Sequence, residues 1–268
     1  MRYTVAQNRI GAPLNNSTSA LRAAAADDEG RVLTVIDSRS DLDFVWRNLR
    51  SYLGFRLRIW INALRNGHAV RAAAIRRYLA STSDPKLHLG ATVAVPGILN
   101  SQITGRVPID VTRRLPLPDR TFALIYSSHL VEHVHRREFH RFLAEGLRVL
   151  RPGGLHVVAA PSAEKIARAV YGHDGNPREL LFDRARQYFH DGEITSAHQM
   201  NLAMRGFGHR FLYDTDYMRW IGARVGYVSV EKVGNFEVPD PGICAYLKSH
   251  KPPRWDAQTE TWVFRAPG

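Results

Sequence analysis

Two histidines and a glutamate stand close together near the middle of the chain, with side chains that can move protons or bind metals. His129 and His133 are four residues apart and Glu132 lies between them, so on a helix the three would share one face. Three roles are open for this pattern: a metal site in an inverted zinc-protease motif, a general base at His129 whose ring Glu132 or Ser127 orients, or a hydrogen-bonded helix cap.

The segments around these residues predict one half of a parallel α/β sheet. Residues 122–126 are continuously apolar, as a strand buried on both faces should be. A helix is predicted over 138–150, where one face is apolar and an Arg-Pro-Gly-Gly turn follows. Residues 155–160 then return as a buried strand. Ligands bind at the carboxyl ends of such strands, so the polar run 127–133 lies where a site is expected.

Flanking segments extend this sheet on both sides. A helix is predicted over 213–226, which ends at a glycine, and helical periodicity recurs at 162–171 and 177–190. We expect a long Pro-rich loop between the last two strands. The other predicted strands are short apolar runs at 86–90, 98–103, 107–111, 227–234 and 259–266.

The alternation of strands and helices predicts one α/β domain over 85–268. Residues 1–40 are interpreted as a loosely structured segment and 41–84 as a helical extension. The polar segment 162–210 follows the carboxyl end of a strand, where an insertion would cover a ligand cleft. We therefore expect it to form a lid.

The helical extension combines an apolar stripe with many arginines. Its apolar side chains recur at spacings of three and four, which predicts one continuous face. That face could pack on its own domain, pair with a second copy in a homodimer, or lie on an anionic membrane surface, and the sequence leaves these partners open. The stripe consists of Trp46, Leu49, Leu53, Leu57, Trp60 and Leu64.

Composition narrows the class of protein. The chain has 268 residues, 44% of them hydrophobic, and a formal net charge of +12. The basic residues are spread along the chain without a nucleic-acid-binding motif, so we expect no nucleic-acid partner. Cys244 is the single cysteine, which excludes an intramolecular disulfide. No apolar run is long enough to span a membrane and the first residues lack a signal-peptide core, so we expect a cytoplasmic protein.

Several motifs together resemble one enzyme family. The run LPLPDRTFALIYSSHLVEH followed by FLAEGLRVLRPGG is similar to the class I S-adenosylmethionine-dependent methyltransferases, and to a bacterial subgroup associated with polysaccharide and glycoconjugate biosynthesis. The resemblance covers about 76–268 and implies a Rossmann-like, seven-stranded sheet whose last strand is antiparallel. Further matching pieces are RRYLASTSDPKLHLG, VPGILN, GHRFLYD and KPPRWDAQTETWVFRA.

The resemblance implies a cofactor site for S-adenosylmethionine that departs from the family pattern. Gly90 begins the glycine loop, but Thr92 stands where the family usually has glycine, and Gln102 stands where a carboxylate holds the ribose. Both changes should weaken cofactor binding. Asp110 falls on the adenosine side, although it could equally cap the turn before Thr112. Ser127 completes the implied cofactor-binding set.

The resemblance also implies a reaction and an acceptor. His129, with Glu132 and His133, would act in catalysis by taking the proton of an acceptor hydroxyl on a sugar or another polar small molecule. The family has the same His-x-x-Glu-His letters without a metal, so no metal ligand is predicted. The rival hypothesis is a protein of this fold that has lost cofactor turnover and serves as a binding or scaffold protein, or catalyses another reaction.

The matching stretch at 208–214 implies residues that approach the cleft from the lid side. They could contact the substrate, or they could be a buried aromatic residue and a hydrogen-bonded histidine without a ligand. The residues concerned are His209, Arg210 and Tyr213.

Overall fold

A computed structural model describes residues 53, 54, 57–62, 64, 65, 67–172, 177–189, 193–251 and 253–268. The predicted segment 1–40 and the first part of the helical extension, with Trp46 and Leu49, lie outside the described residues. All the elements named below belong to one compact unit, Phe55–Gly268.

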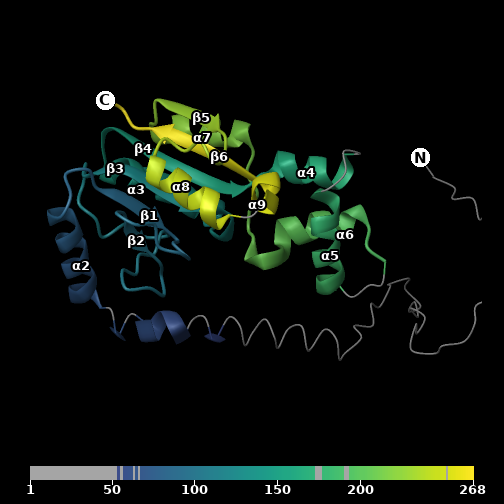
Figure 1. Cartoon of the computed structure of the whole chain (residues 1–268), viewed down its shortest axis with the longest axis horizontal. Coiled ribbons are helices and arrows are strands. Elements are labelled where there is room, and N and C mark those ends of the chain that lie inside the picture. Colours follow the sequence, from purple (N-terminus) through teal and green to yellow (C-terminus); the bar gives the residue numbers. More distant parts are fainter. Residues whose placement is uncertain are drawn as a thin grey trace, which may run out of the picture. The chain divides into compact units, whose positions relative to one another are not determined.

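The core of this unit is a six-stranded sheet in the order β2-β1-β3-β4-β6-β5 (Figure 1). Strands β2, β1, β3 and β4 are parallel neighbours, whereas β6 runs antiparallel to both β4 and β5. The predicted fold class, a mostly parallel sheet with an antiparallel last strand, is confirmed, although the described residues form six strands and not the seven that the resemblance implies. The strands are β1 (Lys86–Leu89), β2 (Leu99–Ser101), β3 (Phe122–Ser128), β4 (Leu150–Pro161), β5 (Ser229–Val233) and β6 (Thr259–Arg265).

The strand predicted at 107–111 is wrong. These residues form irregular backbone, although Val107, Ile109 and Val111 are buried in the core. Pro108 interrupts the run and has no N–H to donate to a sheet. The backbone carbonyl of Val107 instead accepts a hydrogen bond of 2.8 Å from the Ser101 hydroxyl. Apolar residues can thus line a core without forming a strand.

Helices cover both faces of the sheet. On one face, α2 (His68–Ala80), α3 (Arg136–Val149) and α7 (Thr215–Val225) bury side chains such as Ile75, Phe142 and Ile221. On the other face, α8 (Pro241–His250) packs its apolar side chains against alternate residues of β3 and β4. Adjacent strand residues point to opposite faces, which explains why β3 and β4 are apolar throughout.

The connection between the last two strands is helical, which corrects the predicted Pro-rich loop. It contains α8 and α9 (Pro253–Gln258). Pro241 stands at the first position of α8, where its missing N–H costs nothing, and the Asp240 side chain accepts a hydrogen bond of 2.8 Å from the Ile243 N–H. The prolines therefore start helices here.

The second half of the sheet follows the prediction closely. Helix α3 contains residues 138–149 of the predicted helix, whereas Leu150 already begins β4. Helix α7 ends at Gly226, whose φ of 111° closes the helix in the left-handed conformation. The predicted Pro-Gly-Gly turn lies within β4, where the pairing with β3 shifts register between Phe122 and Leu124. The turn is thus a bulge in a longer strand.

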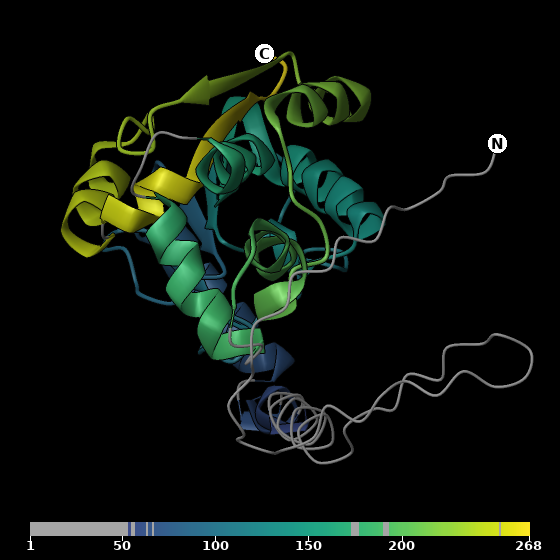
Figure 2. The same ribbon diagram turned by 90° about the vertical axis from the view of Figure 1, so that its right-hand side faces the viewer.

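Three helices follow β4 at one end of the sheet. They are α4 (Ala163–Tyr171), α5 (Pro177–Phe189) and α6 (Ser196–Arg205), and a short 3-10 turn, η2 (Gly206–Gly208), comes next. Figure 1 shows them grouped beside the sheet, and Figure 2 shows them in front of it. The sequence predicts α4 and α5 but not α6. The interpretation of this segment as a lid stays a prediction.

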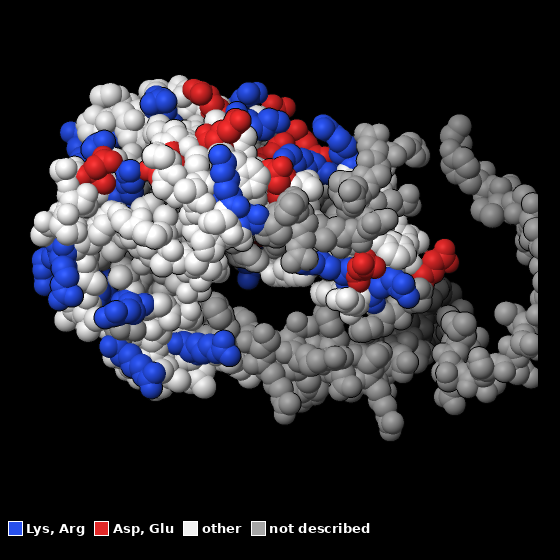
Figure 3. Space-filling view, in the orientation of Figure 1, with Lys and Arg blue, Asp and Glu red and all other residues white. Residues whose placement is uncertain are grey.

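The end of the helical extension has an apolar and basic surface. Leu57, Trp60 and Leu64 are each more than half exposed. In Figure 3, Lys and Arg side chains gather over α2 without acidic neighbours. No helix among the described residues is long and apolar enough to cross a membrane. Contact with an anionic membrane surface or a second copy stays a prediction.

Candidate active site

The carboxyl end of β3 holds a strained residue. His129 follows the strand directly and has a φ of 51°, a left-handed conformation that residues other than glycine rarely adopt. Its backbone N–H donates to the carbonyl of Ala159 at 2.9 Å, which ties the turn to β4. Such strained positions cluster at functional sites. The turn leads into the 3-10 turn η1 (Val131–His133).

The imidazole of His129 is held from two sides. Its Nδ1 lies 3.2 Å from Oε1 of Glu132, and its Nε2 lies 3.0 Å from the hydroxyl oxygen of Thr259. The Trp255 ring lies nearby, with its centroid 6.1 Å from that of the imidazole. About a third of the side chain is exposed, since its relative accessibility is 36%. The ring is therefore both oriented and accessible, as a proton acceptor must be.

Two polar groups beside His129 are buried without hydrogen-bond partners among the described residues. They are the hydroxyl of Ser127 and the carboxylate of Glu132, which makes no hydrogen bond although its Oε1 lies 3.2 Å from Nδ1 of His129. Each side chain is fully buried. Leaving a buried polar group unpaired costs about 1–3 kcal/mol. Such groups mark where a ligand or ion would supply the missing partner.

The lid side brings a second histidine to the cluster. The rings of His133 and His209 have centroids 5.1 Å apart, although the residues lie far apart in the sequence. Burial lowers the pKa of His209, whose Nδ1 lies 2.7 Å from the carbonyl of Ala203. The backbone N–H of Arg210 donates to the carbonyl of Glu132 at 2.7 Å. This bond fixes the 209–210 segment against η1.

Arg210 and Tyr213 differ in their access to a ligand. The Arg210 side chain is exposed, and its guanidinium lies 3.0 Å from Nε2 of His135. Tyr213 is fully buried in the core, and its hydroxyl donates to the carbonyl of Val131 at 3.3 Å. Burial raises its pKa well above the usual value. These contacts favour the alternative of a core aromatic for Tyr213, and its substrate role stays a prediction.

Three strand ends meet beside this cluster. Leu89 of β1 pairs with Ser101 of β2 and with Ser127 of β3, so Gly90 and Gln102 begin neighbouring loops. Gly90 has a φ of 75°, and a side chain there would come within 3.3 Å of Leu130.

The other predicted cofactor residues are less closely involved. Thr92 is exposed and does not fill the space between the strand ends. Oδ1 of Asp110 accepts hydrogen bonds from the N–H and hydroxyl of Thr112, at 3.0 and 2.7 Å. Asp110 thus forms the turn that the sequence offered as its alternative role. No described interaction joins it to Gly90 or Ser127.

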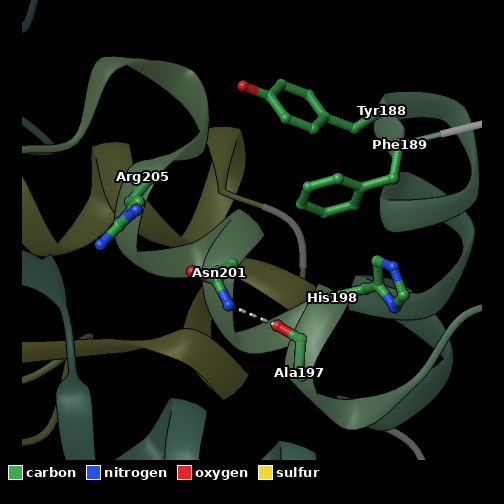
Figure 4. A pocket seen from close by; sticks show the side chains of 6 residues that line it. All are labelled: Tyr188, Phe189, Ala197, His198, Asn201 and Arg205. Atoms are coloured by element: carbon green, nitrogen blue, oxygen red, sulfur yellow. Dashed lines mark hydrogen bonds between the residues drawn. The ribbon is translucent and has the colours of Figure 1, made fainter. Parts of the chain in front are cut away.

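A separate hollow of about 400 Å³ lies between α5 and α6, away from the strand ends (Figure 4). The sequence analysis missed it, because it depends on how two helices of the 162–210 segment pack. It also missed Thr259 and Trp255, whose approach to His129 comes from the chain's last strand and the helix before it. The hollow is lined by Tyr188, Phe189, Ala197, His198, Asn201 and Arg205.

The comparison with protein families assigns the segment that holds the cluster. Residues 99–158, which run from β2 through β3, η1 and α3 into β4, match the family model described as "Methyltransferase domain". This segment, about a fifth of the chain, is therefore similar to a methyltransferase domain. The match supports the prediction of a methyltransferase, whereas the bacterial glycoconjugate subgroup stays a prediction. No curated protein matches the chain.

Solved methyltransferase structures resemble this domain only distantly. Phosphoethanolamine N-methyltransferase 2 of Haemonchus contortus, in complex with S-adenosyl-L-methionine, is 10% identical with a TM-score of 0.40, and the match covers 75% of this chain and 53% of that one. This chain thus spans about half the length of that protein. A SAM-dependent methyltransferase from Archaeoglobus fulgidus is 11% identical with a TM-score of 0.40, covering 74% and 93% of the two chains. The domain assignment rests on the match of 99–158.

Proposed function

We propose that this protein transfers a methyl group from S-adenosylmethionine to a hydroxyl group of a polar small molecule, of which a sugar is the first candidate. The observation that carries the proposal is the methyltransferase-domain match over 99–158, because the matched segment contains the strand end and the turn that present His129. The acceptor class rests on the resemblance of the sequence motifs and on the proton-accepting position of this ring.

The residues at the strand ends fit a methyl donor. Ser127 offers a buried hydroxyl without a hydrogen bond, and Gly90 begins the loop after β1 with a φ of 75°, a conformation that favours glycine. These two residues would hold the cofactor between β1 and β3, and Thr92, Gln102 and Asp110 stay predictions for the same site. S-adenosylmethionine, when bound, supplies an already activated methyl group. The protein then has two tasks, which are to align the acceptor oxygen with the methyl group and to remove one proton from the acceptor.

His129 is the proposed general base. In the structure Nε2 lies 3.0 Å from the hydroxyl oxygen of Thr259, and an acceptor hydroxyl that replaced this hydroxyl as the partner of Nε2 would stand where the ring can accept its proton. The carboxylate of Glu132, 3.2 Å from Nδ1, would stabilise the imidazolium that results. His133, His209 and Arg210 border the same space and would contact the acceptor from the lid side.

Transfer of a radiolabelled methyl group to a panel of hydroxylated acceptors tests the proposal. The purified chain is incubated with labelled S-adenosylmethionine and mono- and disaccharides. We expect at least one acceptor to be labelled, and we expect His129→Ala to lower kcat at least about a hundredfold. His68→Ala, at an exposed residue at the start of α2, serves as the matched control.

Two results would contradict the proposal in different ways. Full turnover by His129→Ala would remove the general base while leaving the methyltransferase. No stabilisation of the folded chain by millimolar S-adenosylmethionine or S-adenosylhomocysteine would instead favour a protein of this fold that has lost cofactor turnover.

A further inference from the structure

The side chain of Glu132 lies in an environment that is unfavourable for a carboxylate. The side chain is fully buried, and neither oxygen has a hydrogen-bond partner among the described residues. The groups nearest to Oε1 are Nδ1 of His129 at 3.2 Å and Nε2 of His133 at 3.8 Å. A buried carboxylate without strong hydrogen bonds requires a nearby positive charge. The surrounding groups are imidazoles, which can carry a proton or, when neutral, bind a transition metal.

His209 brings a ligand atom to this carboxylate from another part of the chain. Its Nδ1 lies 2.7 Å from the carbonyl oxygen of Ala203, so Nδ1 carries the hydrogen and Nε2 keeps its lone pair. Metal-binding histidines almost always donate their second ring nitrogen in this way. The hydrogen bond between the backbone N–H of Arg210 and the carbonyl of Glu132 holds the two segments together.

We propose that Glu132, His133 and His209 bind a divalent transition-metal ion, with Zn²⁺ as the best match. One ligand atom from each residue lies within 4.8 Å of the other two. Two imidazoles and one carboxylate form the ligand set of open zinc sites, which keep a further position for water or substrate. Ligand atoms at roughly 2.1 Å from a tetrahedral zinc are about 3.4 Å apart, so the three must move closer together on binding.

The structure allows this contraction. The side chain of His133 is 40% exposed, so its ring can turn without disturbing the core. Gly208 has no side chain to cover that ring, whereas a Cβ at this position would lie in van der Waals contact with Nδ1 of His133, at 3.8 Å. Glu132 and His209, in contrast, are held in place by their backbone and ring hydrogen bonds. With Glu132 and His209 held and the ring of His133 free to turn, the three ligand atoms can close around an ion as it binds.

Metal binding does not depend on the proposed methyl transfer, but it would deepen that function. An ion beside His129 could bind the acceptor oxygen and make its hydroxyl easier to deprotonate. Acceptors with two neighbouring oxygens, such as sugar diols, would gain most from it. This extension rests on the proposed function, whereas the site itself rests only on the geometry of the three side chains.

Metal titration of the untagged full-length chain tests the inference. The protein is stripped with a chelator, dialysed and titrated with Zn²⁺ by calorimetry, and with Co²⁺ by its visible absorption. We expect one ion per chain at micromolar affinity or better. His133→Ala and His209→Gln should each weaken binding at least about a hundredfold, since loss of a ligand exceeds the 10–100-fold loss typical of its outer partners. His68→Ala should bind as the wild type does.

The outcomes separate this inference from the proposed function. No binding at high micromolar metal, or equal binding by the wild type and by both ligand variants, would overturn the site. His133→Ala changes an exposed side chain, so it remains informative if another variant fails to fold. Metal binding without methyl transfer would support the site and contradict the proposed function. Full methyl transfer by the metal-free chain would support the proposed function and contradict the role of the ion in it, while the site is decided by the titration alone.

Discussion

The two halves of the parallel sheet use their polar side chains in opposite ways. Beside β1 and β2, polar groups bond to the backbone of their own loops: Asn100 makes three such bonds, to Val95 and Ile98. At the end of β3, Ser127 and Glu132 are more deeply buried than Asn100, yet none of their side-chain oxygens has a hydrogen bond among the described residues, and only imidazole rings approach the carboxylate of Glu132 within 4 Å as an ion pair would. The polar side chains beside β1 and β2 therefore stabilise the loops there. Those at the end of β3 have hydrogen-bonding capacity left for a ligand.

The largest effect that we expect is on the free energy of unfolding. Asn100→Ala should lower the free energy of unfolding by about 3 kcal/mol, because three hydrogen bonds of about 1 kcal/mol each are lost. Ser127→Ala should not lower it and should raise it by up to about 1–3 kcal/mol, because the substitution removes a buried hydroxyl that has no hydrogen-bond partner. Urea unfolding measures both. A large destabilisation by Ser127→Ala would show that this hydroxyl belongs to the structure.

A second prediction concerns the buried histidines, which are structural in both halves. Burial lowers the pKa of His88 in β1 to about 4 and that of His156 in β4 to about 3. Both rings are neutral in the fold, so the stability they contribute is complete above pH 6.5. It is lost as pH falls towards these values, because the unfolded chain takes up protons first. Each ring contributes a slope of about 1.4 kcal/mol per pH unit.

His156→Phe tests this pH dependence. The ring lies among Phe142, Tyr227 and Phe264, and a phenyl group there removes the titrating nitrogen together with its 3.0 Å hydrogen bond to the Tyr227 hydroxyl. Between pH 6 and about 4.5 the unfolding free energy of the variant should fall less steeply with decreasing pH, by about 1.4 kcal/mol per pH unit. Urea titrations at each pH measure this slope. An unchanged slope would mean that His156 is already charged in the folded chain.

The smallest predicted effects concern Asp110. Asp110→Ala should cost about 1 kcal/mol of stability through the lost turn, and Asp110→Asn should keep the acceptor at Oδ1 and cost less. Neither should change the affinity for S-adenosylhomocysteine more than about threefold. The measurement is calorimetric titration of both variants. A tenfold loss in the Asn variant alone would place the carboxylate in the cofactor site and extend the ligand-facing region into the first half of the sheet.

The two halves of the sheet also differ in how well the sequence predicts their elements. Strands β3 and β4 and helix α3 were predictable, because continuous apolar runs and a one-sided helix carry strong local signals. The strand expected at 107–111 was wrong, since Pro108 and packing decide the backbone there. The prolines before β6 suggested a loop. In the structure Asp240 caps the N-terminus of α8 and Pro241 occupies its first position, so this part of the segment is helical.

The site was predictable in its location more than in its contacts. The sequence places His129, Glu132 and His133 together through their spacing. It cannot show that Thr259 faces the ring of His129, or that His209 joins Glu132 and His133, because these contacts join segments separated by about 75 residues or more. Such long-range approaches depend on the whole sheet and its helices.

The central claim is that ligands bind at the end of β3 and not in the hollow between α5 and α6. Calorimetric titration with S-adenosylhomocysteine tests it on Ser127→Ala and on Asn201→Ala, whose residue lines that hollow. Loss of one hydrogen bond to the ligand should weaken binding to Ser127→Ala about tenfold, while Asn201→Ala binds as the wild type does. Unchanged affinity in Ser127→Ala together with a loss in Asn201→Ala would contradict the account.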